Sequence, residues 1–115
     1  MSFLDEHKKD IDSLFSMIQI HVKEKYDVDV NNIDEVKSKS RKAHFVYFRK
    51  MMMLILGETF LNKYNQDEIS SVVNRDRTSL IHHFKTHHND YGFLKGYKEE
   101  YDQIKNAYLE KIGKC

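Results

Sequence analysis

Three consecutive polar residues, Arg77, Thr78 and Ser79, have side chains suited to contacting the base edges of DNA. An arginine can donate two hydrogen bonds to guanine O6 and N7, and a threonine offers its methyl group to thymine and its hydroxyl to a base or phosphate. Asp76, directly before them, is a favoured helix N-cap. We therefore expect a helix that begins at residue 77 and exposes these side chains on its first turn. The alternative is an ordinary helix start whose polar residues are solvated.

Two short helices joined by a tight turn would position this triplet as a helix-turn-helix does. Asn65 and Glu68 have the three-residue spacing of a capping box, which predicts a first helix over 66–73. A turn at 74–75 then leads into a second helix over 77–88. In that geometry the second helix enters the major groove with its N-terminus first. The residues placed to contact phosphates are Arg75 in the turn and Lys85 farther along the second helix.

Upstream of this motif, residues 37–50 carry six bases and no acid, in a chain whose net charge is only +1. A cationic surface must therefore be local, which excludes a uniformly basic protein. The densest part is a loop expected over 37–42, called here the basic loop. Flexible basic arms enter narrow minor grooves, where the negative potential is concentrated. The alternative is a solvated loop with no partner.

The rest of the chain is also expected to be helical. Apolar residues recur at three- and four-residue steps, and there is no proline and only four glycines. The sequence predicts one all-α domain over 1–115, with an N-terminal helix within 1–26, a short helix capped by Asn31 or Asn32, a helix over 43–62 and a last helix over 93–112. The residues expected to be buried include Leu4, Met51, Met52, Met53, Ile81, Leu94, Tyr97, Tyr101, Ile104, Tyr108 and Ile112.

Four blocks of the sequence resemble the C-terminal DNA-binding domain of the bacterial replication initiator DnaA. They are YDVDV at 26–30, SKSRK at 38–42, RKMMMLIL at 49–56 and ISSVVNRDRTSLIH at 69–82, the last being the most specific. The blocks follow the family's order, and the resemblance covers about residues 18–90. It implies a helical bundle with a helix-turn-helix, similar to the DnaA C-terminal or Trp-repressor-like fold. It also implies sequence-specific binding of double-stranded DNA, in replication initiation or its regulation.

The resemblance implies roles for individual residues as well. Arg41 matches the loop arginine that enters the minor groove, and Arg49 matches a helix arginine that contacts the DNA backbone. Asp76 to Ser79 match the base-reading segment Asp-His-Thr-Thr, so that Arg77 replaces the usual histidine and Ser79 the second threonine. These replacements are expected to change the preferred bases. The other residues expected at the DNA, mostly at phosphates, are Lys39, Lys42, Lys50, Asn65, Gln66, Arg75, Thr78 and His82.

Several kinds of chemistry are not expected. The chain has no GxxxxGK(S/T) phosphate loop and no room for a nucleotide-binding domain, so we expect no nucleotide cofactor and no ATPase activity. It has no paired nucleophile and base and no carboxylate pair, so we do not expect an enzyme. His83 and His87 stand four residues apart, but a zinc site needs about four ligands and no cysteine or carboxylate cluster accompanies them. We therefore expect no metal cofactor.

The expected partner is double-stranded DNA, and two protein partners stay open. The apolar stripe of the last helix either covers the first helix within one core, which we prefer, or joins two copies in a homodimer. The alternative to DNA binding is a protein-interaction module on a DnaA-like fold. Its basic loop would then meet an acidic partner, such as another replication protein.

We expect no membrane association and a cytoplasmic location. The longest strongly apolar run, 51–56, is far shorter than the roughly 20 residues that span a bilayer. Asp5 and Glu6 stand where a signal peptide would be apolar. The single cysteine, Cys115, allows no internal disulfide, which is typical of a reduced compartment.

Overall fold

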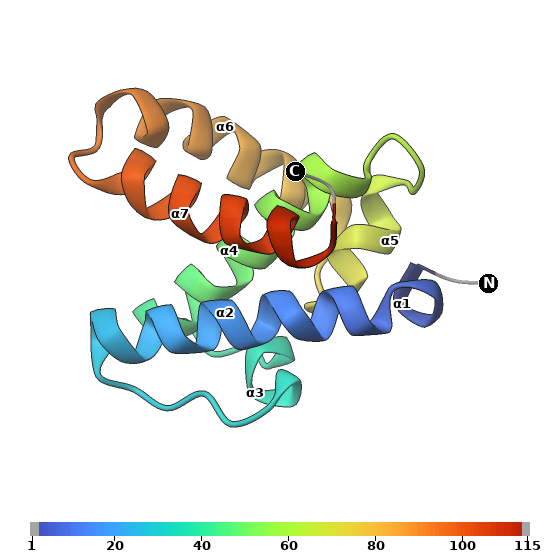
Figure 1. Ribbon diagram of the computed structural model, residues 1–115, viewed down its shortest axis with the longest axis horizontal. Helices are drawn as coiled ribbons and strands as arrows, with labels where there is room; N and C mark the ends of the chain where they lie inside the picture. Colours follow the sequence, from blue (N-terminus) through green and yellow to red (C-terminus); the bar gives the residue numbers. More distant parts are fainter. Residues whose placement is uncertain (1–2, 114–115) are drawn as a thin grey trace.

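Helices account for every regular element in residues 3–113, the part of the chain that this computed structural model describes (Figure 1). The prediction of an all-α protein is confirmed for these residues, and Cys115 lies outside them. None of the described helices is long and apolar enough to cross a membrane. The helices are α1 (Phe3–Glu6), α2 (Lys8–Tyr26), α3 (Ile33–Lys37), α4 (Ala43–Phe60), α5 (Gln66–Ser71), α6 (Arg77–Phe93) and α7 (Tyr97–Lys111).

The central element is α4, around which the other helices pack. Every residue from 51 to 57 is buried, so this stretch is covered on all sides. A helix that is apolar all round is stable in water only when neighbours cover its whole circumference. Here α2, α3, α5 and α6 supply that cover. The expectation that Met51, Met52 and Met53 fill the core is confirmed, since each is at most 1% exposed.

The last helix lies along both α2 and α6 (Figure 1). Its apolar stripe of Tyr97, Tyr101, Ile104 and Tyr108 is buried, and α2 contributes Ile11, Leu14, Ile18 and Val22 to the same core. The preferred expectation, that this stripe covers the first helix, is confirmed. The prediction for Leu94 is wrong because α7 begins only after Gly96, whose left-handed φ of 82° separates it from α6. Leu94 is therefore 56% exposed.

The predicted N-terminal helix is interrupted at His7, whose φ of −120° and ψ of 27° are not helical. The interruption changes which side of the chain faces the core. Phe3 is buried, with its ring centroid 5.0 Å from that of Phe60 and 4.7 Å from that of Tyr64. Leu4, which the periodicity placed inside, is 43% exposed.

The second helix of the motif is longer than predicted, since α6 runs to Phe93 instead of ending at 88. Contacts near its end account for the extension. Lys50 pairs with Asp90 at 2.8 Å, and the Tyr91 hydroxyl donates to the Asp102 carboxylate at 2.9 Å. The core-facing side of α6 carries Leu80, and Ile81, the next residue, is 39% exposed, contrary to expectation.

The close packing of α4 against α6 depends on Gly57. A Cβ atom at this position would lie 2.8 Å from Cζ of Phe84, whereas one at Gly92 would meet nothing within 4 Å. Glycine therefore sets how near the motif's second helix lies to the central helix. Phe84 in turn packs against the edge of the core.

Gly57→Val is expected to lower the free energy of unfolding by about 2 kcal/mol, because the added carbons overpack the contact with Phe84. The matched variant Gly92→Val, in open space on α6, should change it by less than about 0.5 kcal/mol. Urea titration followed by circular dichroism measures both. Equal effects at the two positions would show that the contact between α4 and α6 does not restrict the side chain at position 57.

Candidate nucleic-acid interface

Both predicted helix caps of the helix-turn-helix are present. The Asn65 side chain accepts a hydrogen bond from the Glu68 N–H at 2.8 Å, and the Asp76 carboxylate accepts one from the Ser79 N–H at 3.1 Å. Asn74 takes the left-handed conformation with φ of 55°, which asparagine tolerates better than most residues. These local bonds satisfy backbone donors that a helix start leaves free, so they fix where α5 and α6 begin.

The first turn of α6 presents the predicted base-reading residues to solvent. Arg77 and Thr78 are exposed, and Ser79 is half-buried at the edge of a groove. The next residue, Leu80, is fully buried and anchors the turn to the core. This alternation leaves the first two polar side chains uncovered by the rest of the domain.

The basic loop lies beside the start of α6 and forms a groove with it. The groove has a volume of about 680 Å³ and places loop residues next to the turn of the motif and the first two turns of α6. Among its lining residues four are bases and one, Asp76, is an acid. The lining residues are Lys39, Ser40, Arg41, Val46, Arg49, Asn74, Arg75, Asp76, Ser79 and His83.

Arg49 is buried and holds the basic loop from inside. Its side chain is 5% exposed, and Nη1 donates to the Val36 carbonyl at 3.0 Å and to the Ser38 carbonyl at 3.1 Å. Nη2 donates to the carbonyl of Ser40. The prediction that Arg49 lies on the polar side of its helix is wrong, because its donors are turned toward the loop backbone. Sequence spacing could not show this, since the carbonyls come from another segment.

The basic loop is further tied to the motif and to itself, so it is not a free arm. Arg75 Nη2 donates to the Ser38 carbonyl at 2.8 Å, which joins the turn of the motif to the loop. Within the loop, the Ser38 and Ser40 hydroxyls accept from the N–H groups of Ser40 and Lys42, both at 3.3 Å. The half-buried Arg75 is thus a bridge between the two segments as well as a groove residue.

Lys50 forms an ion pair with a residue of α6. Its ammonium pairs with Asp90 at 2.8 Å, lies 5.0 Å from the ring centroid of Tyr97, and its side chain is 16% exposed. It lines a separate hollow with Tyr47 and Tyr97 and is not a lining residue of the groove. This pair joins α4 to the end of α6, and the phosphate contact expected of Lys50 stays a prediction.

The other predicted residues lie at or near the surface. Lys39, Arg41, Lys42 and Arg77 are exposed, and none of these four takes part in an ion pair recorded within residues 3–113. The remaining predicted residues are Asn65, which is exposed but used as a cap, Gln66, which is half-buried, and His82 and Lys85, which are exposed.

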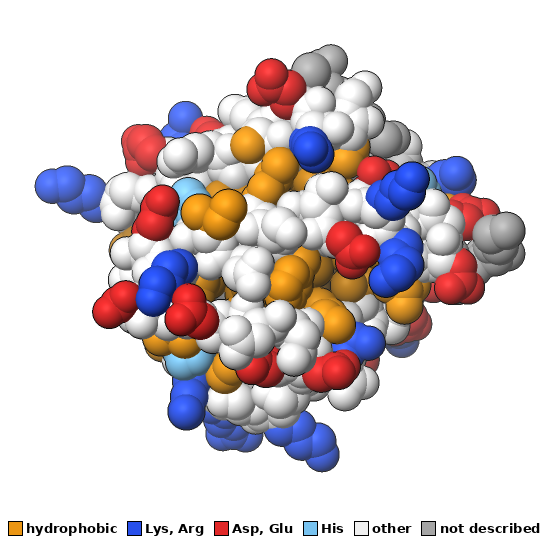
Figure 2. All heavy atoms as spheres, turned by 60° about the horizontal axis from the view of Figure 1, so that its bottom comes forward, with side chains coloured by type: hydrophobic (Ala, Val, Ile, Leu, Met, Phe, Trp, Pro, Cys, Tyr) orange, Lys and Arg blue, Asp and Glu red, His pale blue; other side chains and the backbone are white. Residues whose placement is uncertain are grey.

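The face carried by α2 and α3 is different in character (Figure 2). There acids and bases are interspersed, and apolar side chains are exposed between them. Ion pairs on α2 include Lys8 with Asp12 at 3.6 Å and Lys23 with Asp27 at 3.2 Å. A face with both signs of charge in alternation produces no strong local potential. The groove, by contrast, brings together Lys39, Arg41, Arg49 and Arg75 with one acid, Asp76.

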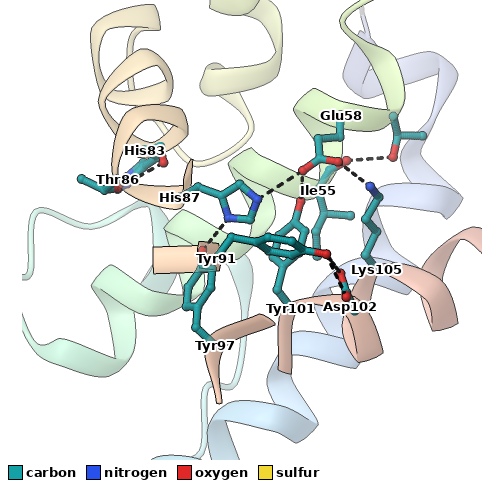
Figure 3. Close-up of polar contacts among 11 residues, drawn as sticks. Ile55, Glu58, His83, Thr86, His87, Tyr91, Tyr97, Tyr101, Asp102 and Lys105 are labelled. Carbon is teal, nitrogen blue, oxygen red and sulfur yellow. Dashed lines mark hydrogen bonds and ion pairs between the residues drawn. The ribbon is translucent and has the colours of Figure 1, made fainter. Parts of the chain in front are cut away.

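A polar cluster farther along α6 joins α7 to α4 and α6 (Figure 3). The Glu58 carboxylate accepts from the Tyr101 hydroxyl at 2.5 Å and pairs with Lys105. His87 contacts Glu58 through Nε2 at 3.6 Å and the Tyr97 hydroxyl through Nδ1 at 2.8 Å. Burial raises the pKa values of Tyr97 and Tyr101, which keeps both as neutral phenols. This cluster of Glu58, His87, Tyr97, Tyr101 and Lys105, called here the clasp, holds the three helices together.

His83 and His87, which were considered as a pair of zinc ligands, have different surroundings. Both ring nitrogens of His87 are engaged within the cluster, whereas His83 lines the groove. The two residues are one turn apart on α6, and Figure 3 shows the His87 ring within the cluster. In residues 3–113 no group of three or more histidine, cysteine or acidic side chains is arranged to hold a metal ion.

Sequence reasoning did not identify His83 as a groove residue. Its burial lowers its pKa to about 4, and the nearby cations Lys50, Arg49 and Arg75 act in the same direction. Burial also lowers the pKa of His87, against the opposing effect of Glu58. No signal in the sequence predicts the low pKa of His83, since three of the cations around it belong to α4 and to the turn of the motif.

Arg49→Ala is expected to lower the free energy of unfolding by about 2 kcal/mol, because several loop carbonyls lose charged hydrogen-bond donors. Lys39→Ala, which removes an exposed cation from the same loop, should change it by less than about 0.5 kcal/mol. Urea titration gives the stabilities, and amide hydrogen exchange at 38–42 should accelerate only in the Arg49 variant. Unchanged exchange in that variant would contradict the assigned role.

The free energy of unfolding is expected to fall as pH is lowered from about 6.5 toward 4. In this range His83 of the unfolded chain takes up a proton, whereas the folded chain resists protonation until about pH 4, so the unfolded state binds more protons. Urea midpoints between pH 7.5 and 4.5 measure the effect. His83→Gln should reduce this pH dependence, and His21→Gln on α2 should leave it intact. An undiminished slope in the His83 variant would refute the assignment.

Comparisons with known proteins identify no relative. A scan against models of known protein families finds no match, and searches of curated proteins and of solved structures find no significantly similar chain. What the groove binds is therefore inferred from its own geometry and charge.

Proposed function

We propose that this protein binds double-stranded DNA with sequence preference. The first turn of α6 would enter the major groove while the basic loop enters the adjacent minor groove. The observation that supports this best is the shared groove, in which Arg41 of the loop and Ser79 of α6 line one hollow. Ser38 and Arg75, which are 37 positions apart in the sequence, are hydrogen-bonded beneath it.

The charge around the groove fits a polyanion. Lys39, Arg41, Lys42 and Arg77 are exposed there without a recorded ion pair in residues 3–113, whereas Lys50 is paired within the domain. Uncompensated cations held close together repel one another, and a row of phosphates relieves that repulsion while releasing counterions. Nucleic acid is the partner whose charge density matches such a cluster.

The positions of the side chains suggest a division of roles. Arg77 and Thr78, exposed on the first turn of a capped helix, would contact base edges. Arg41 would enter the minor groove, with Lys39 and Lys42 at the neighbouring phosphates. Arg49 acts from beneath by holding the loop in place and makes no DNA contact in this scheme.

A DnaA-like or Trp-repressor-like fold is part of the same proposal. It is supported by the order of the helices, by the turn between α5 and α6, and by the sequence of residues 69–82. The process we propose is replication initiation or its regulation in the cytoplasm, without ATPase activity. A homodimer or a replication-protein partner would extend this role and is not required for the DNA contacts described.

Arg41→Ala is expected to weaken binding of all duplexes about tenfold, because it removes a contact that depends little on sequence. The slope of log affinity against log salt should fall by about one. Fluorescence anisotropy with a labelled duplex measures both quantities. Lys9→Ala on α2 removes one charge from another face and should change affinity less than twofold.

Arg77→His is expected to change which sequences are recovered by selection from random duplexes. Histidine cannot donate the two parallel hydrogen bonds that arginine donates to guanine O6 and N7. The free-energy difference between the preferred and the other bases should therefore change by about 1–3 kcal/mol at each of one or two base pairs. Sequencing of the selected pools shows the difference. Identical selected sequences from both proteins would mean that position 77 does not contact bases.

Failure to bind any duplex at low salt would overturn the proposed function. A protein that binds no DNA but is captured by an acidic protein partner would instead match the alternative of an interaction module. The Arg41 and Arg77 variants distinguish the two functions. A protein that binds only a protein partner would show neither the loss of duplex affinity nor the change in selected sequences.

A further inference from the structure

His83 occupies an unusual place on α6. It lies one turn after Ser79 and is half-buried in the lining of the groove. Its ring makes a tilted contact with the ring of His82, with centroids 5.9 Å apart, and no hydrogen bond to the imidazole is recorded within the described residues. His83 stands one turn before His87, whose ring nitrogens are engaged in the clasp. Within the described residues, by contrast, no recorded hydrogen bond occupies the ring nitrogens of His83.

Most of the charged groups near His83 are cations, although one of them, Lys50, is paired with Asp90. Arg49 and Lys50 approach from α4, Arg75 from the turn of the motif and His82 from α6 itself. Across the groove the loop contributes Lys39 and Arg41. The acid of the groove, Asp76, already accepts a hydrogen bond from the Ser79 N–H. Burial and these cations lower the pKa of His83 to about 4, so the free protein holds it neutral near pH 7.

We infer that His83 is a phosphate-binding residue of this groove and binds the phosphate as a protonated imidazolium. This inference rests on the proposed function, since the phosphate belongs to the DNA backbone. A phosphate in the groove would offset the surrounding cations, and an opposite charge within about 4–6 Å favours the charged form of a histidine. The protonated ring then has two N–H donors, whereas the neutral ring has one.

DNA binding must therefore take up a proton, and affinity must rise as pH falls. The sign follows from linkage, because a group protonated in the complex but neutral in the free protein makes binding tighter at lower pH. If the attraction of the phosphate offsets both the burial and the cations and brings the pKa to about 6.5, affinity increases about tenfold between pH 7.5 and 5.5. DNA phosphodiesters do not titrate in this range, so the proton must go to the protein.

The first experiment measures affinity for a labelled duplex by anisotropy at pH 7.5, 6.5 and 5.5, at constant ionic strength. Circular dichroism at each pH confirms that each protein is folded. The wild-type protein should gain about tenfold across this range, His83→Gln less than twofold, and His21→Gln as much as the wild type. A pH gain that survives in His83→Gln, or that disappears in His82→Gln instead, would overturn the inference.

The second experiment separates this inference from the proposed function. The pKa of the His83 imidazole is followed by NMR in the full chain with and without inorganic sulfate, an oxyanion whose charge is constant across this pH range. A rise of at least one unit with sulfate supports an anion site at His83 even if no duplex binds, in which case only the proposed function fails. An unchanged pKa alongside normal duplex binding leaves DNA binding intact and rejects the role of His83.

Discussion

The buried guanidinium of Arg49 is the interaction on which the candidate interface depends. It belongs to α4, whose central stretch is covered on all sides, and it bonds carbonyls of α3 and of the basic loop. A loop held to the core in this way has less conformational entropy to lose when it binds a ligand. Arg75 shares the Ser38 carbonyl, so the turn of the motif and the loop are fixed relative to one another.

The same arrangement concentrates positive charge, with opposing consequences. Repulsion among Arg49, Arg75 and the exposed loop cations disfavours the free groove, and His83 reduces that repulsion by remaining neutral. A bound anion would offset this repulsion and would lower the free-energy cost of protonating His83. The repulsion among these cations destabilises the unoccupied groove, and the same repulsion would favour the binding of a phosphate there.

The other end of α6 supplies the rigidity that such a surface needs. Gly57 allows close packing of α4 against Phe84, and Lys50 pairs with Asp90 near the helix end. The clasp around Glu58 and His87 then holds α7 against both helices (Figure 3). Because these contacts lie away from the groove, they restrict the direction of α6 without occupying its first turn.

Features that depend on neighbouring residues could be predicted from the amino-acid sequence. Helical periodicity, the caps at Asn65 and Asp76 and the exposed Arg77 follow from spacing and local hydrogen bonding, and all are present. The burial of Arg49, the pairing of Lys50 and the low pKa of His83 could not be predicted in this way, since they arise from the packing of the helices. The reason is physical: the partners of these charged groups come from distant segments, and the energy of a charge depends on whatever surrounds it in space.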